Sequence, residues 1–448
     1  MDRSWYLKRL RAMGPGEIAR RSGDKLQELI WRRRYFVRRA QPEPAPTDRI
    51  VAGGLSRMRA GDAPAAASAN LVQFADRLLG GEWPTFAVDR SDVTGDVDWH
   101  LDPASGKHAP AKTYAFDIPF VGGAAQFDTK YVWELSRHHQ TTVLAMAFWL
   151  TGDDRYARAA VAQVQSWIRA NPFLHGIHWS SGIELGLRLI AFTWTRRLLD
   201  GWPPVRNHFE EHEEFSRCVF LHQWVLAHRH SHGSSANNHL LYEMAGLFIS
   251  CCAMPWHENA VNWRKHAATI LELEFPRQVF PSGYTRELAS DYNGFVLEGL
   301  LLCLAETRLS GCDLAPRLTE CARRMSQWLA EYSDCGGHPP RQGDSDDASG
   351  FLLDAPEYDR WRDVADWSGK WFGLSSSAGV SLRAYLFAPL SPAPNLPAAM
   401  SDHVATGSDS GLSILRARRG TDDEIYCVFD AGPLGYLSTA AHGHADAL

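Results

Sequence analysis

The sequence predicts a mainly α-helical domain followed by antiparallel β structure, and two changes of pattern along the chain support this. Between residues 125 and 390, apolar residues recur with the period of amphipathic helices. From Gly411 onward they alternate with polar residues, the spacing of a strand with one buried face. A chain of 448 residues that is 45% hydrophobic is long enough for two domains with a large core in the first.

The helices of the first domain are expected to form hairpins, because short breakers separate them. The turn 151–154 closes one helix and caps the next, while 171–172, 201–204 and Gly311 stop others. Hairpins side by side form a solenoid or a closed ring, and periodicity does not separate the two. The expected helices are 130–150, 153–170, 182–199, 211–227, 238–250, 261–278, 292–309 and 316–332.

The flanking segments differ from these helices. Residues 1–40 predict a basic helix, and 41–110, rich in Pro, Ala, Gly and Asp, predict an irregular lead-in. Near the C-terminus, 412–418 and 425–430 alternate around the turn 420–423 and predict a β-hairpin. Two or three strands do not cover both faces of a sheet, so the β domain is expected to be incomplete in this chain. The predicted division is 1–110, 111–395 and 405–448.

Composition restricts the class of partner and compartment. The formal net charge of −6 gives no global attraction for nucleic acid, so a polyanion would need a locally basic cleft. The basic first forty residues favour a solvated helix face, with a membrane-surface or partner-binding helix as the alternative. No apolar run is long enough for a transmembrane segment. Charges interrupt any secretory core at the N-terminus, which predicts a cytoplasmic protein; a mis-annotated start would favour the periplasm.

Two amides and an imidazole precede an apolar helix at Asn237, Asn238 and His239. Either asparagine would serve as the N-cap of that helix. The preceding loop 228–233 holds three histidines but has no carboxylate or cysteine at ligand spacing. A metal is therefore not expected there.

A turn led by Gly283 carries Arg286, Glu287, Asp291 and Tyr292 into another apolar helix. So many polar side chains beside an apolar helix suggest a cleft. The structural alternative is that Asp291 caps the helix and Arg286 pairs with Glu287 or Asp291 at the surface.

Two further segments place tryptophan near arginine and glutamate: Trp133 precedes Arg137, and Trp179 precedes Glu184. An exposed tryptophan beside an arginine suits a sugar ring that carries a carboxylate, because the ring stacks and the guanidinium forks. The chain has 17 tryptophans, however, so each of these two favours a core role when judged alone.

The last residues of the chain also carry candidate chemistry. Alternation puts His442, His444 and Asp446 on one side of an extended segment, where a proton-transfer histidine and a metal ligand can lie side by side. No polar tail follows them, so we expect the chain to end inside its second domain.

Taken in order, these segments resemble the heparinase II/III family of polysaccharide lyases over roughly residues 110–448. The resemblance implies an incomplete α/α toroid of helical hairpins, followed by the first strands of an antiparallel β-sandwich. It also implies cleavage of an acidic, uronic-acid-containing polysaccharide or oligosaccharide by β-elimination. The matching segments are 133–137, 237–239, 283–292, 343–347, 429–433 and 442–446.

The resemblance assigns roles to matching residues. Asn238 would neutralise the uronate carboxylate, so that the proton beside it can be removed. Tyr292 and His442 would share the work of base and acid, and which does which depends on substrate stereochemistry. The implied substrate-binding residues are His239, Arg286, Glu287, Trp133, Arg137 and Trp179.

The resemblance also implies a cofactor and one departure. His444 matches a ligand of a structural zinc, whose other ligands are expected beyond Leu448, with Asp446 in a supporting or turn position. Ser136 stands where many relatives carry an amide-bearing residue, which loosens the transfer of the substrate site.

Two other functions compete with the lyase. A glycoside hydrolase would need two carboxylates flanking the bond, drawn from Glu184 or Glu287 with Asp291 or Asp344. A polysaccharide-binding protein of an exopolysaccharide pathway would keep the cleft without turnover.

Overall fold

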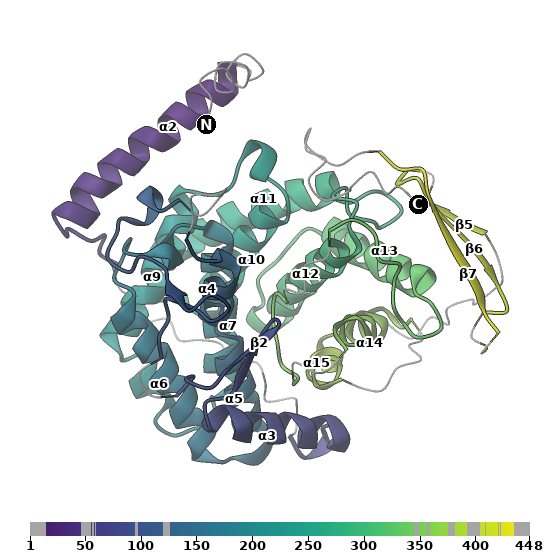
Figure 1. The fold of residues 1–448 in the computed structure, drawn as a ribbon, viewed down its shortest axis with the longest axis horizontal. Coiled ribbons are helices and arrows are strands. Elements are labelled where there is room, and N and C mark those ends of the chain that lie inside the picture. Colours follow the sequence, from purple (N-terminus) through teal and green to yellow (C-terminus); the bar gives the residue numbers. More distant parts are fainter. Residues whose placement is uncertain are drawn as a thin grey trace.

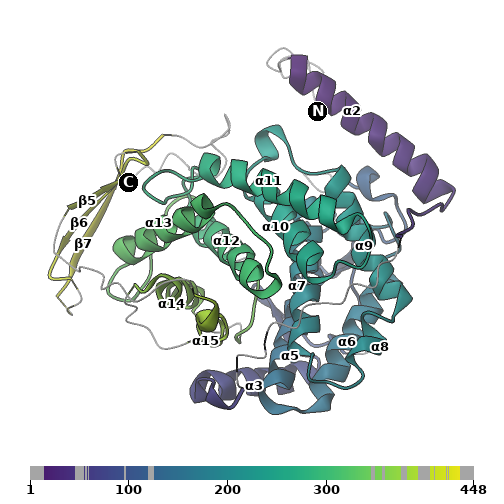
Figure 2. The same cartoon turned by 180° about the vertical axis from the view of Figure 1, so that it is seen from behind.

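The computed structural model describes residues 15–45, 55, 58, 60–94, 97–119, 126–344, 349–355, 359–374, 381–391, 404–407, 409–419, 421 and 423–433. The helices of the main body follow one another around an arc, with a three-stranded sheet at one edge and a long helix at the opposite edge (Figure 1). The view from behind shows the same arrangement (Figure 2). The predicted class, a helical toroid followed by β structure, is confirmed.

Four helices form the inner row of the arc: α5 (His139–Thr151), α7 (Gly182–Leu198), α10 (Asn238–Ala253) and α12 (Ser290–Ser310). Each packs against the next along the row. Most of their residues are buried on every side of the helix, not along one stripe. Such all-round burial is expected of helices that neighbours cover on all sides.

Four amphipathic helices form the outer row: α6 (Asp154–Ala170), α9 (Glu213–His228), α11 (Ala260–Gln278) and α13 (Pro316–Tyr332). Each packs on the inner helix that precedes it in the chain, which produces the expected helical hairpins. The bounds of α6, α7, α9, α11, α12 and α13 lie within two residues of those expected from the sequence.

Two expectations about helices are corrected. The segment 130–150 is not one helix, because it is divided into α4 (Thr129–Ser136) and α5 at His138, whose φ of 63° is left-handed. The lead-in expected to be irregular contains α3 (Ala65–Leu79). This helix buries Leu71, Phe74 and Leu78 and packs on α5. Its apolar spacing is helical, although the segment around it is rich in the small residues and prolines that are typical of loops.

Several further elements complete the body. Helix α2 (Pro15–Trp31) continues into the π-helical turn Arg32–Val37, and the short α8 (Val205–His208) connects α7 to α9. Helices α14 (Arg360–Phe372) and α15 (Leu382–Phe387) follow α13 along the arc. No helix in the described part of the chain is long and apolar enough to cross a bilayer.

Backbone contact between α7 and α10 sets the spacing of the inner row. A β-carbon built on Gly246 would lie 2.3 Å from the carbonyl oxygen of Gly186, and one on Gly186 would lie 2.3 Å from the carbonyl oxygen of Tyr242. Neither glycine therefore has space for a side chain. The contact brings the two inner helices closer than larger residues would permit.

The C-terminal strands form one antiparallel sheet in the order β5 (Val404–Gly407), β6 (Leu412–Ala417), β7 (Ile425–Asp430). The β6–β7 hairpin confirms the sequence prediction, with Ala417 opposite Ile425. The alternation did not predict β5.

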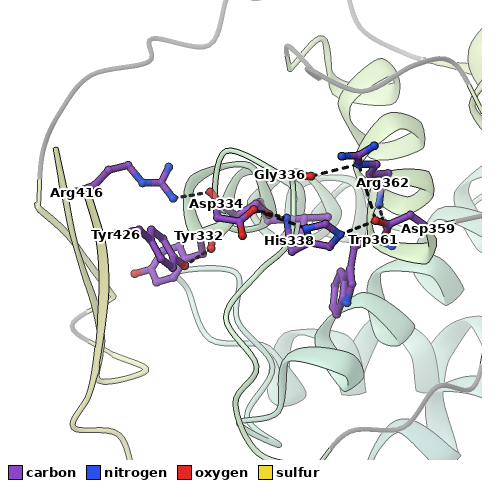
Figure 3. A network of polar contacts seen from close by, with 11 residues as sticks. Tyr332, Asp334, Gly336, His338, Asp359, Trp361, Arg362, Arg416 and Tyr426 are labelled. Carbon is purple, nitrogen blue, oxygen red and sulfur yellow. Dashed lines mark hydrogen bonds and ion pairs between the residues drawn. The ribbon is translucent and has the colours of Figure 1, made fainter. Parts of the chain in front are cut away.

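Polar contacts attach this sheet to the helical body (Figure 3). The Tyr426 hydroxyl donates to the carbonyl of Tyr332, at the end of α13, at 2.6 Å. In the loop that follows, the backbone N–H of His338 donates to Asp334 at 2.9 Å, and the His338 ring pairs with Asp359, the N-cap of α14. The loop after α13 thus contacts both the sheet and the next helix.

We predict that Gly246→Ala lowers the free energy of unfolding by about 1 to 2 kcal/mol. Helix propensity alone would stabilise the variant by about 1 kcal/mol, but the clash is with the α7 backbone and costs about 2 to 3 kcal/mol, the upper part of the usual range for an overpacked core. Urea unfolding measures the difference. Gly201→Ala is the control, because its β-carbon would meet no atom within 4 Å. Stability of Gly246→Ala equal to wild type would contradict the close approach.

Candidate active site

A cavity of about 1200 Å³ lies where α4, α7, α10 and α12 begin. The first turn of each of these helices contributes residues to its wall. Helix N-termini carry unpaired N–H groups and a partial positive charge, each contributing about 0.3 to 1 kcal/mol to a nearby anion. Four such ends around one space favour a negatively charged ligand.

Asn238 and Tyr292, predicted from separate segments, both line this cavity, and so does His239. Asn237 is the N-cap of α10, and its side chain accepts from the backbone N–H of His239 at 3.1 Å. This settles which asparagine caps the helix. Because Asn237 does so, the side chain of Asn238 is left for the cavity wall.

Glu287 holds Asn238 in place. Its carboxylate accepts from the backbone N–H of Asn238 at 3.0 Å and from the side-chain Nδ2 at 2.8 Å. Glu287 is 2% exposed and is not among the residues that line the cavity. Asn238 is also 2% exposed, and its amide nitrogen has a second N–H bond besides the one that it gives to Glu287. Glu287, predicted from the sequence to bind substrate, thus contacts Asn238 behind the cavity wall.

Tyr292 is half-buried in the first turn of α12, next to Asp291. Asp291 lines this cavity and also a second one of about 680 Å³, on whose wall Asp344 lies. The N-cap of α12 is Ala289, with no side-chain cap, so Asp291 does not cap the helix as the structural alternative supposed.

Arg286 is not on the cavity wall, although the resemblance made it a helper of Asn238. Val279 and Thr285 form an antiparallel bridge, and the backbone N–H of Arg286 donates to the carbonyl of Gln278 at 2.8 Å. Successive side chains of extended backbone point to opposite sides. Glu287 therefore points to Asn238, while the Arg286 guanidinium lies 4.4 Å from the centre of the Phe280 ring.

Arg137 and Glu184 line the cavity as members of one buried ion triad. The Arg137 guanidinium donates to both oxygens of Glu184, at 3.0 and 2.8 Å, and to Glu134 at 2.8 Å. Two carboxylates thus compensate the charge of Arg137. The sequence suggested that its guanidinium binds a sugar carboxylate, but these two carboxylates already occupy it. Glu184 is equally occupied.

Of the two candidate stacking residues, only Trp133 keeps an accessible surface. It is half-buried on the cavity wall, and its indole donates to the carbonyl of Ile177 at 3.2 Å. Trp179 is 2% exposed, with its ring 5.1 Å from Phe173 and 4.5 Å from His222, centre to centre. Trp179 is therefore mainly a core residue that contributes an edge to the cavity.

Ser136 lies in the core and not in the cavity. It is fully buried, its hydroxyl accepts from the Trp167 indole at 3.2 Å, and its carbonyl accepts from Arg188 at 3.0 Å. The departure from the family at this position therefore affects packing beneath the site.

Sequence analysis missed Glu243 as a component of the cavity wall. Its buried carboxylate accepts from the backbone N–H of Ser231 at 2.6 Å and from the Ser231 hydroxyl at 2.7 Å. Burial raises the pKa of Glu243 to about 7, against the lowering effect of these bonds. The signal was present in the sequence, because Glu243 is the only carboxylate of α10.

His442, His444 and Asp446 lie outside the described residues. Their catalytic and zinc-binding roles therefore stay predictions. Within the described ranges, no three His, Cys, Asp or Glu side chains come together in a group that could hold a metal ion.

Comparisons with known proteins show the family that this chain resembles. A family model described as Heparinase II/III N-terminus matches residues 62–350, more than half of the chain. A heparin-sulfate lyase of Pedobacter heparinus is 24% identical over 175 residues, which make up 37% of this chain and 25% of that protein. A heparin-sulfate lyase of Bacteroides stercoris is 24% identical over 225 residues, or 47% of this chain and 34% of that protein.

A solved structure supports the fold. The crystal structure of a heparinase III matches with a TM-score of 0.50 at 14% identity, covering 89% of this chain and 56% of that one. The chain thus spans a quarter to a third of the curated relatives it matches and about half of this structure. Because the family model covers most of the helical body and its site, the chain belongs to the heparinase II/III family.

Proposed function

We propose that this chain carries the catalytic cleft of a polysaccharide lyase that cleaves a uronic-acid-containing polysaccharide by β-elimination. The observation that carries the proposal is the convergence of Asn238 and Tyr292, from two different helical hairpins, on one cavity. The relatives named heparin-sulfate lyase favour a glycosaminoglycan as the substrate class.

The first step is to make the proton beside the uronate carboxylate acidic enough to remove. Its removal places negative charge on the carboxylate, so the site must stabilise that charge as it develops. Asn238 has one amide N–H left after its bond to Glu287, and the N-terminus of α10 adds a partial positive charge beside it. A preorganised donor at a helix N-terminus suits this task.

The second step is proton transfer. A base removes the proton beside the carboxylate, the C–O bond to the leaving sugar breaks, and an acid protonates the leaving oxygen. The phenol hydroxyl of Tyr292 can donate its proton to that oxygen, so Tyr292 is proposed as the acid. His442 is proposed as the base on the resemblance alone. A structural zinc bound by His444 is proposed on the same ground.

The competing hydrolase receives less support from the carboxylates. Glycoside hydrolysis needs one carboxyl as acid and a second as base or nucleophile. Glu184 is bound to Arg137 through both oxygens, and Glu287 to Asn238 through both oxygens. Asp291 lies on the wall of both cavities, whereas Asp344 lies only on that of the second one, away from Asn238. If the protein binds the polysaccharide but forms no product, the third function, a polysaccharide-binding protein, is supported.

We predict that Tyr292→Phe lowers kcat by about 100-fold or more, because the variant loses the proton donor and little packing. The measurement is the ultraviolet absorbance of the unsaturated sugar end, with heparan sulfate and an unsulfated uronate polymer as substrates. Tyr131→Phe is the control, since Tyr131 is also half-buried but does not line the cavity. An active Tyr292→Phe variant would remove Tyr292 from the mechanism.

We predict that Glu287→Gln lowers kcat by about tenfold with a smaller change in KM. A hydrogen bond to a charged acceptor contributes about 1.5 to 3 kcal/mol, and its loss leaves the Asn238 amide less well oriented. Steady-state kinetics on the same polymers measure the split, with the exposed Glu214→Gln as control. Unchanged kcat in Glu287→Gln would show that Asn238 needs no such support.

A further inference from the structure

We propose that Arg20, on helix α2, binds an acidic group of the polysaccharide within the same cavity. This inference rests on the proposed function and extends it to substrate recognition. Helix α2 precedes residues 62–350, the part of the chain that the family model matches. Arg20, Arg21 and Asp24 nevertheless line the cavity. The recognition element therefore comes from outside the matched domain.

Contacts along one face of α2 fix it to the rim of the cavity. The Gln27 side chain donates to the carbonyl of His228 at 3.0 Å, and Glu28 forms an ion pair with Arg229 at 2.6 Å. At the end of the helix, the Trp31 ring lies 4.8 Å from that of Trp224. Helix α2 is thus held by residues of the end of α9 and of the start of the loop 228–233.

The guanidinium of Arg20 lies against Gly233, next to the cavity. A β-carbon on Gly233 would lie 2.7 Å from Nη2 of Arg20, and Gly233 has a φ of +61°. Any larger residue there would displace the guanidinium and strain the loop. The Nε of Arg20 is buried and makes no hydrogen bond within the described residues, so a ligand in the cavity would bind the terminal nitrogens of the guanidinium.

Arg20 differs from the other arginines on the cavity wall in its charge balance. Within the described residues it pairs with no carboxylate. The other three are compensated: Arg21 by Glu17 at 2.8 Å, Arg137 by Glu184 at 2.8 Å, and Arg229 by Glu28 at 2.6 Å. An uncompensated guanidinium on a cavity wall attracts an anion more strongly than a paired one.

The two histidines near Arg20 add no fixed positive charge of their own. Burial lowers the pKa of His230 to about 4, and burial followed by the charge of Arg20 lowers the pKa of His232. Both rings are therefore mostly neutral at pH 7 and can act as hydrogen-bonding groups. Asp24 lies one turn further along α2 on the same cavity wall and repels an anion. The anionic group of the ligand is therefore favoured at Arg20 itself and not along the whole helix face.

The ligand group is a planar or tetrahedral oxyanion, either a uronate carboxylate or a sulfate. Both accept two parallel N–H bonds from a guanidinium. Lysine would supply the charge but not the fork.

Equilibrium binding separates this inference from the proposed lyase activity. Isothermal titration would use a sulfated heparan fragment and an unsulfated glucuronate fragment of equal length, with protein that carries Tyr292→Phe to prevent turnover. We expect Arg20→Gln to weaken binding at least tenfold and Arg20→Lys to recover part of it. Arg33→Gln is the matched control, because Arg33 is exposed beyond α2 and away from the cavity. Equal melting temperatures would show that α2 stays in place.

The outcomes distinguish the two claims. Weaker binding of both fragments by Arg20→Gln assigns a carboxylate, and weaker binding of the sulfated one alone assigns a sulfate. If Arg20→Gln binds both fragments as tightly as the protein with Arg20, the role of Arg20 is overturned, even if the enzyme with its natural Tyr292 cleaves the polymer. If Arg20→Gln weakens binding but the enzyme with its natural Tyr292 forms no unsaturated product, the role of Arg20 is supported and the lyase activity is refuted. No binding of either fragment would overturn both.

Discussion

The two hydrogen bonds from Asn238 to the Glu287 carboxylate are the constraint on which the account of the site depends. They connect the first turn of α10 to the turn that leads into α12. Tyr292 follows five residues after Glu287, on α12 itself. One carboxylate therefore fixes the amide and links the segment that carries the phenol to the same wall. Without it, two side chains from separate hairpins would be related only by general packing.

The toroid makes this local arrangement possible. Neighbouring inner helices α7 and α10 touch through their backbones at Gly186 and Gly246, and the hairpin order brings several inner helices to the cavity by their N-terminal ends. The partial charges of those ends add to one another at a single place. Helix α2 lies at the rim, outside the family domain, and brings Arg20 to it, which pairs with no carboxylate among the described residues. The fold thus supplies N–H donors and partial positive charge at the helix ends, while individual side chains supply the geometry.

Sequence reasoning located the helices because these depend on local signals, while Asn238 and Tyr292 were singled out by the family resemblance. Caps, breakers and apolar period define α13 and its neighbours within one chain segment. It failed where tertiary contacts decide the outcome. Nothing local shows that Arg137 is neutralised by Glu184, or that Arg286 packs on Phe280 instead of facing the cavity. The role of Arg20 depends on a loop more than two hundred residues later in the chain.

The most direct test of the central claim is the mass of the products formed in water enriched in oxygen-18. Elimination across the C–O bond adds no water, so the account predicts products that carry no label and include an unsaturated sugar at one end. Hydrolysis inserts one water oxygen for each bond cleaved. Labelled, fully saturated products would contradict the account, because they would assign the cavity around Asn238 and Tyr292 to a hydrolase.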